Sequence, residues 1–186
     1  MAYTTTAAVK TYLGISGSGD DALLTTLITA AQGYIDSYCH QTFEAGSDTT
    51  RYFNAADVDA SLQTLTLDYP LCQITSVTNG DDTLVTDYRT IPRNDAPYYA
   101  LRVIGSGYWD ADDDDAEIEI VGRWAYSVTA PDVVAQACVR LTAFLYRQKD
   151  TSADIDRALI TDAGVTILPG SMPRDVAEML APFMRY

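Results

Sequence analysis

The chain has 186 residues, of which 47% are hydrophobic and 20% are charged, and its formal net charge is −14. This composition excludes a disordered protein, and the length favours one compact unit with elaborations over two full domains. No apolar run is long enough to span a bilayer, so we expect no membrane segment.

The excess negative charge is concentrated in the middle of the chain. Residues 44–129 hold five Lys/Arg and sixteen Asp/Glu, for a net charge of −11. Residues 1–43 hold one against three and residues 130–186 hold six against seven, for −2 and −1. An acidic surface repels phosphate, which excludes DNA binding through a basic patch in the middle segment but not the passage of DNA nearby.

Helical patterns lie on both sides of the acidic middle segment. A short helix is predicted at residues 5–14, where Thr5 or Thr6 caps the start and Gly14 ends it. Residues 20–43 place apolar side chains three and four apart, with Asp20 and Asp21 at the positive end of the helix dipole. Residues 131–149 carry a second broad apolar stripe. We expect these two stripes to pack against each other.

Short extended segments occupy the region between the helices. Residues 64–67 and 74–78 are rich in β-branched residues, and Asn79-Gly80 favours a tight hairpin turn. A second hairpin is predicted to join residues 88–91 to residues 98–103 through a proline-containing loop. The predicted fold is α+β: a mainly helical bundle of two long antiparallel helices and a short N-terminal helix. A small antiparallel β-sheet module is inserted at residues 44–129.

Candidates for catalysis or metal binding are few. The chain has one histidine, His40, and three separate cysteines, Cys39, Cys72 and Cys138, which do not form a zinc motif. We expect the cysteines to be free and structural, and we expect no catalytic residue, cofactor or metal. The alternative is a calcium-binding module that uses the acidic run of Asp110, Asp112, Asp113, Asp114 and Asp115. This run departs from a calcium loop because an aspartate stands where that loop needs glycine and a valine where it needs glutamate.

An ordered series of short segments resembles the head–tail connector, or neck adaptor, proteins of tailed phages. The series comprises residues 9–15, 20–24, 35–38, 42–43, 68–71, 74–77, 87–89, 122–126 and 131–138. It runs over most of residues 6–148, which points to one connector domain at residues 1–149.

The resemblance implies a structural protein and not an enzyme. Proteins of this family form rings, typically of twelve copies, beneath the portal protein and join it to the tail or to a tail terminator or stopper. Genome DNA passes through the hole without sequence-specific binding. The expected location is the neck of the virion, after synthesis in the host cytoplasm. A tail-completion or tail-terminator protein of the neck is the alternative within this class.

Two surfaces are predicted to serve this function. Residues 150–186 are expected to form a C-terminal arm that docks on the portal, as the ends of related proteins do; the alternative is a terminal helix that folds back onto its own core. Its apolar and aromatic residues have no obvious internal mate: Ile167, Leu168, Met172, Val176, Met179, Leu180, Phe183 and Tyr186. The acidic run at residues 110–115 is the candidate surface facing the DNA channel.

Overall fold

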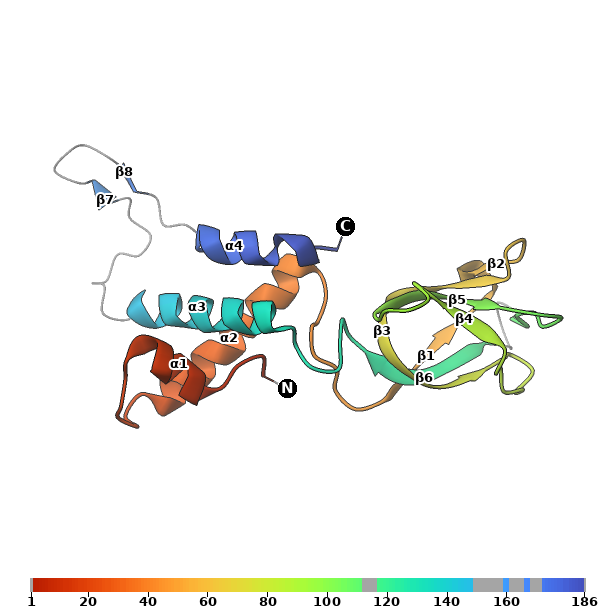
Figure 1. Ribbon diagram of the computed structural model, residues 1–186, viewed down its shortest axis with the longest axis horizontal. Helices are drawn as coiled ribbons and strands as arrows, with labels where there is room; N and C mark the ends of the chain where they lie inside the picture. The colour runs from red at the N-terminus through yellow and green to blue at the C-terminus, as the bar shows by residue number, and fades with distance from the viewer. Residues whose placement is uncertain (1, 112–116, 149–158, 161–165, 168–171, 186) are drawn as a thin grey trace. The chain divides into compact units, whose positions relative to one another are not determined.

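The computed structural model describes residues 2–111, 117–148, 159–160, 166–167 and 172–185. The chain forms two compact units, a sheet unit of Gln41–Ala130 and a helical unit of Ala2–His40 with Pro131–Tyr186 (Figure 1). The helical unit is therefore built from two stretches that flank the sheet unit in sequence. The predicted boundary between a connector domain and an arm falls at residues 149–150, outside the described residues, and it stays a prediction.

The helical unit contains α-helices from both of its stretches. Their bounds are α1 Thr6–Leu13, α2 Asp21–Cys39, α3 Asp132–Gln148 and α4 Arg174–Leu180. A short 3-10 helix, η2 Ala181–Phe183, continues α4. Two short antiparallel strands, β7 Leu159–Ile160 and β8 Thr166–Ile167, come before α4 in the chain.

Both ends of α1 are capped by the residues predicted from the sequence, whereas the side chain predicted to cap the start of α2 does not cap it. The Thr5 hydroxyl oxygen accepts the Ala8 amide at 3.2 Å, and Gly14 ends α1 in the left-handed region at φ 72°. Asp20 makes no capping hydrogen bond with its side chain. It accepts the Tyr146 hydroxyl of α3 at 2.6 Å, and Asp21 pairs with Lys10 of α1 at 2.7 Å. The two carboxylates thus connect α2 to its neighbours.

The apolar stripes of α2 and α3 pack together as predicted. Val9 of α1, Leu24 and Ile28 of α2 and Val139 of α3 form one buried cluster. Further buried side chains extend this packing along α2 and α3: Ala31, Ile35, Cys39, Val134, Ala137, Cys138 and Leu141. Burying a valine, leucine or isoleucine contributes about 1.5–3 kcal/mol, so this packing stabilises the helices far more than their caps do.

The sheet unit is an antiparallel sheet in the strand order β1-β6-β3-β5-β4, with β2 paired to β3. The strands are β1 Thr49–Phe53, β2 Val58–Asp59, β3 Thr64–Thr78, β4 Tyr88–Ile91, β5 Tyr98–Val103 and β6 Ile118–Trp124. A single 3-10 turn, η1 Ala55–Asp57, links β1 to β2. The predicted hairpin of residues 88–91 and 98–103 is confirmed with the same bounds.

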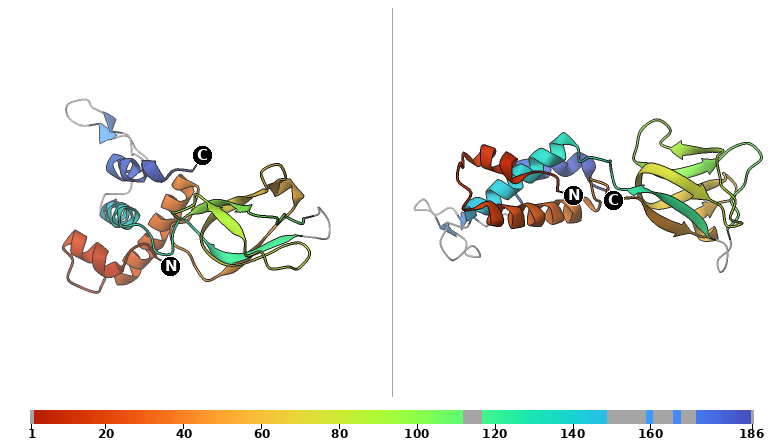
Figure 2. Two further views of the ribbon diagram at one scale, coloured as in Figure 1. Left: turned by 45° about the vertical axis from the view of Figure 1, so that its right-hand side comes forward. Right: turned by 90° about the horizontal axis from the view of Figure 1, so that it is seen from below.

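The long strand β3 bends so that its first half pairs with β5 and its second half with β6. The register with β5 shifts between Thr66 and Leu71, a stretch that includes Pro70. Proline cannot donate a ladder hydrogen bond and is tolerated in strands at such irregularities. The sheet therefore curls, as Figures 1 and 2 show.

Glycine at position 122 allows β6 to approach β3 closely at its bend. A Cβ atom there would lie 2.3 Å from the Gln73 carbonyl oxygen and 2.8 Å from Leu71 Cδ1. Contacts this short do not occur for real Cβ atoms, so the crossing requires a residue without a side chain.

The curled sheet encloses its own hydrophobic core. The buried cluster comprises Phe53, Leu65, Leu67, Leu71, Val77, Leu101, Val103, Trp109, Ile118, Ile120 and Trp124. The two indole N–H groups donate to backbone carbonyls, that of Trp109 to Gln63 at 3.1 Å and that of Trp124 to Thr49 at 3.0 Å. Both tryptophans of the chain lie in this core.

The prediction of a mainly helical bundle with two long helices and a small inserted sheet is therefore wrong. The sheet has six strands around a core of eleven buried residues, whereas α1 and α4 span eight and seven residues. The physical reason is that residues 41–130 contain enough β-branched, leucine and aromatic side chains to enclose a core of their own. The sheet is a principal part of the fold.

Candidate functional surfaces

The C-terminal helix α4 packs within the helical unit. Its Asp175 carboxylate pairs with the Arg140 guanidinium of α3 at 2.8 Å, and the same guanidinium lies 4.0 Å from Met179 Sδ. Beyond η2, the Arg185 amide donates to the Cys39 carbonyl at the end of α2, at 3.1 Å. The segment thus contacts α3 and the end of α2.

The predicted portal-binding residues fall into three groups. Val176 and Leu180 are fully buried, so they hold α4 in place and are not open to a partner in this conformation. Half-buried side chains are found at Met172, Met179 and Phe183. The others are Ile167, which is described as part of β8, and Leu168 and Tyr186, which lie outside the described residues.

The acidic run is described only at its first member. The Asp110 amide donates to Asn79 Oδ1 at 2.8 Å, and the Asp110 carbonyl accepts the Gly80 amide at 2.8 Å. The Asn79 side chain is buried and also donates to the Tyr108 carbonyl at 3.2 Å. These bonds fix the loop after β3 to the segment before β6. Asp112, Asp113, Asp114 and Asp115, four of the five aspartates of the alternative calcium site, lie outside the described residues.

The Asn79-Gly80 turn differs from the predicted two-residue hairpin. The Asn79 amide donates to the Thr83 carbonyl at 2.8 Å, which closes a longer loop, and the positive φ of 62° belongs to Asp82. The sequence signal identified the turn but not its type, because the Asn79 side chain is engaged with the segment around Asp110.

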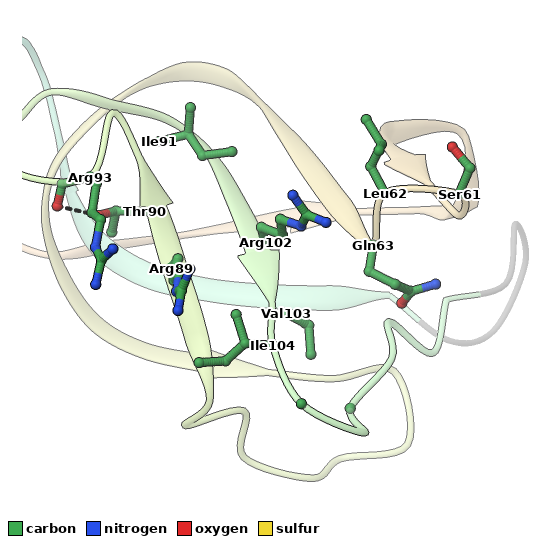
Figure 3. Close-up of a pocket in the computed structure, with 12 residues that line it drawn as sticks. Ser61, Leu62, Gln63, Arg89, Thr90, Ile91, Arg93, Arg102, Val103 and Ile104 are labelled. Carbon is green, nitrogen blue, oxygen red and sulfur yellow. Dashed lines mark hydrogen bonds between the residues drawn. The ribbon is translucent and has the colours of Figure 1, made fainter.

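A groove rich in arginine lies on the β4–β5 hairpin. It has a volume of about 650 Å³, and its lining includes Arg89 of β4, Arg93 of the hairpin loop and Arg102 of β5. Figure 3 shows these residues with Leu62 and Gln63, which precede β3. All three arginines are exposed. Sequence reasoning did not find the groove, because the hairpin was predicted without a register and the pairing of Arg89 with Arg102 is seen only in the structure.

The cysteines and histidine form no metal site in the described part of the chain, where no group of three possible ligands occurs. His40 ends α2 in the left-handed region, and its amide donates to the Asp36 carbonyl. Burial raises the pKa of both Cys39 and Cys138 to about 11, and the nearby Asp36 charge contributes in each case. Burial also raises the pKa of Cys72. The three thiols are therefore protonated at neutral pH, as structural cysteines are.

Asp36 is a half-buried carboxylate of the helical unit. The Asp36 carboxylate accepts the Tyr3 hydroxyl, and burial raises its pKa although this hydrogen bond opposes the shift. Among the described helices, none is long and apolar enough to cross a membrane.

The fold of this chain is similar to that of solved chains from gene transfer agent particles. A chain from the neck of an empty gene transfer agent particle computed with C6 symmetry aligns with a TM-score of 0.63 and 18% identity. That alignment covers 97% of this chain and 88% of the other. A chain from the neck of the native particle computed with C12 symmetry gives 0.58 and 17%, with 89% and 84% covered. A chain from the virion of the native particle gives 0.55 and 17%, with 92% and 83% covered.

The family match is more specific. Residues 3–78 match the family described as phage gp6-like head-tail connector protein. The matched region runs from the residues before α1 to the end of β3, so it includes parts of both units. The resemblance to head–tail connector proteins is confirmed, and it supports a structural role in a neck. No curated protein matches the sequence.

Proposed function

We propose that this chain is a structural subunit of a virion neck, where it connects a head to a tail. The observation that supports this most directly is the agreement of two comparisons. Residues 3–78 match head–tail connectors, and the fold over nearly the whole chain is similar to that of proteins from particle necks. The chain is made in the host cytoplasm and acts in the neck.

The subunits form a ring of twelve copies around a hole through which DNA passes. The C12 and C6 symmetry of the two similar neck structures supports this number, because a ring of twelve is compatible with both. The net charge of −14 supports passage without binding, since excess carboxylates repel phosphate and no sequence-specific contact is needed. The ring joins the portal protein on one side and a tail, terminator or stopper protein on the other.

The role is structural and not enzymatic. The family description is that of a connector, and the single histidine of the chain lies at a helix end where its amide caps α2. A general base beside a nucleophile is the arrangement that hydrolases and transferases need. The chain therefore acts through its surfaces.

The C-terminal segment docks on the portal through its less buried side chains. Val176 and Leu180 hold α4 against the helical unit, and Met172, Met179 and Phe183 provide the apolar surface for the partner. Each contact can be weak, because a ring of copies binds together and the effective concentration multiplies the affinity.

Electron microscopy of the purified protein, alone and mixed with its portal protein, tests the function. At low salt and low concentration we expect a monomer or weak oligomer, because copies of charge −14 repel one another. On the portal we expect a ring. A protein that forms no ring on the portal at any salt concentration would overturn the proposal.

The docking surface needs a separate test. Truncation after Lys149 would remove the buried Val176 and Leu180 and lower stability whether or not the segment docks. Met172→Glu is a better variant, because it places a charge on a half-buried side chain and spares the core. We expect near-normal melting and weaker portal binding, and Arg174→Glu at an exposed position of α4 is the matched control. Unchanged portal binding by Met172→Glu would exclude this surface.

A further inference from the structure

The arginines of the sheet unit divide into two groups. Arg51 pairs with Asp68, and Arg123 pairs with Asp48 at 3.1 Å. The remaining arginines of this unit, Arg89, Arg93 and Arg102, all line the β4–β5 groove, and their side chains form no ion pair within the described residues. We call this site the arginine groove.

The arginine groove keeps like charges side by side. Arg89 and Arg102 are directly opposite each other in the antiparallel register of β4 and β5, so their side chains leave the same face of the sheet. Like charges at opposite positions of neighbouring strands are destabilising. In a segment that contains sixteen acidic residues, this positive charge is not neutralised within the described part of the subunit.

A second groove on the same unit has the opposite charge. It has a volume of about 300 Å³ and is lined by Tyr52, Thr78, Asn79, Gly80, Asp82, Glu117 and Glu119. The three carboxylate side chains form no ion pair within the described residues. We call this site the acidic groove.

The two grooves belong to different edges of the sheet. In the acidic groove, Glu119 of β6 is opposite Tyr52 of β1 and Thr78 of β3. Strand β1 is one end of the strand order and β4, in the arginine groove, is the other, and the grooves share no lining residue. Both can therefore be engaged by different copies at once.

We propose that the arginine groove of one copy binds the acidic groove of a second copy, and that this contact joins neighbouring subunits. The contact is heterologous, because two different surfaces of the same chain meet, and repetition of such a contact around an axis closes a ring. Guanidinium groups bind carboxylates through paired, charge-assisted hydrogen bonds, which fix register as well as add affinity. The inference rests on the proposed ring and adds the surfaces that build it.

Charge complementarity favours a second copy over DNA as the occupant. The acidic groove offers three carboxylates, and the arginine groove offers three guanidinium groups. A DNA duplex approaching the arginine groove would also meet the excess carboxylates of residues 44–129, which repel its phosphates. The carboxylates of the acidic groove would contact the arginine groove over a small area, so they would not meet the repulsion that a DNA duplex meets.

A charge-exchange experiment tests the contact. One variant, Arg89→Glu with Arg102→Glu, makes the arginine groove acidic. The other, Glu117→Arg with Glu119→Arg, makes the acidic groove basic. Neither variant alone retains a complementary pair of grooves, whereas an equimolar mixture has complementary pairs at both edges. Arg147→Glu with Arg174→Glu is the control for net charge, since both positions are exposed in the helical unit.

Association is measured by sedimentation equilibrium at about 0.15 M salt, where charges separated by more than roughly 8 Å are largely screened. We expect each variant alone to associate roughly tenfold or more weakly than the unmodified protein, because like charges then face each other. The mixture should return to the unmodified value, and the control should not weaken association. The Glu→Arg variant is the stronger test. Its net charge is less negative, which by itself would favour association, and yet we expect it to associate less.

Three results would overturn the proposal: no recovery in the mixture, no association of the unmodified protein at millimolar concentration, or normal portal-bound rings of the Arg→Glu variant. Loss of duplex DNA binding by the Arg→Glu variant, without recovery in the mixture, would assign the groove to DNA instead. Failure of the proposed function has a different signature, because the unmodified protein would then form no ring on the portal. Tryptophan fluorescence and circular dichroism confirm that each variant is folded.

Discussion

Replacing Gly122 with alanine should destabilise the sheet unit. The new Cβ would lie 2.3 Å from the Gln73 carbonyl oxygen, about an ångström closer than the 3.4 Å at which ordinary contacts begin. The obstacle is backbone, so β6 or the bend of β3 must move. Forcing extra atoms into a packed site typically costs about 1–3 kcal/mol. For a unit of roughly 60–100 residues, each kcal/mol lowers the melting temperature by about 4–8 °C.

Tryptophan fluorescence and circular dichroism distinguish destabilisation of the sheet unit from destabilisation of the whole chain. Trp109 and Trp124 are both buried in the sheet unit, so tryptophan fluorescence follows its unfolding. Circular dichroism at the helical band follows α2 and α3. We expect urea unfolding of Gly122→Ala to shift the fluorescence midpoint to lower denaturant.

Gly33→Ala is the matched control for this substitution. Gly33 lies within α2, and a Cβ atom there would meet nothing within 4 Å. Alanine is favoured over glycine in a helix interior by about 0.8–1 kcal/mol, so this variant should stabilise the helical signal. If Gly122→Ala changed the free energy of unfolding of the sheet unit, followed by fluorescence, by less than about 0.5 kcal/mol, the close crossing of β6 and β3 would be refuted, since overpacking costs more than that.

Three further predictions concern the helical unit. Leu180→Ala should lower its free energy of unfolding by about 2–5 kcal/mol, measured by circular dichroism in urea, and a loss below about 1 kcal/mol would show that α4 is not packed. Burial raises the pKa of Asp36 above 3.8, so its folded form favours the proton, and stability is lost as pH rises from 3.8 through the raised pKa. Asp36→Asn should lack this loss in urea titrations across that range, and a parallel pH dependence of both proteins would contradict the assignment. Replacing Cys39, Cys72 and Cys138 by alanine should leave ring assembly intact with only a loss of stability; a well-folded triple variant that cannot join a tail would show a functional thiol.

The sequence predicted individual strands and hairpins better than it predicted the relative size of the sheet and the helical part. The hairpin of residues 88–91 and 98–103 was predicted with its observed bounds, because its strands are β-rich and its loop contains two prolines. The strand β3 was predicted as two segments, since Pro70 interrupts the pattern. That interruption is a change of register within one strand, and only the pairing of its two halves with different neighbours shows it.

The candidate surfaces depended on contacts between distant parts of the chain. Val176 and Leu180 had no mate in the local sequence, because α4 packs on α3 and Asp175 pairs with Arg140, thirty-five positions earlier in the sequence. The acidic middle segment was evident from composition, but its three unpaired arginines were obscured by the net charge. Assigning them required knowing which arginines already have carboxylate partners.

The division of the chain also has a consequence for the order of folding. The sheet unit is continuous in sequence, from Gln41 to Ala130, so all its strands leave the ribosome before α3 does. The helical unit cannot form from α1 and α2 alone, because α3 and α4 come after the sheet unit in the sequence. Closing a long loop before native contacts form slows folding. Prior collapse of the sheet unit shortens that loop, because its first and last strands, β1 and β6, pair directly. We therefore expect the sheet to fold first during synthesis and to bring the helical segments together.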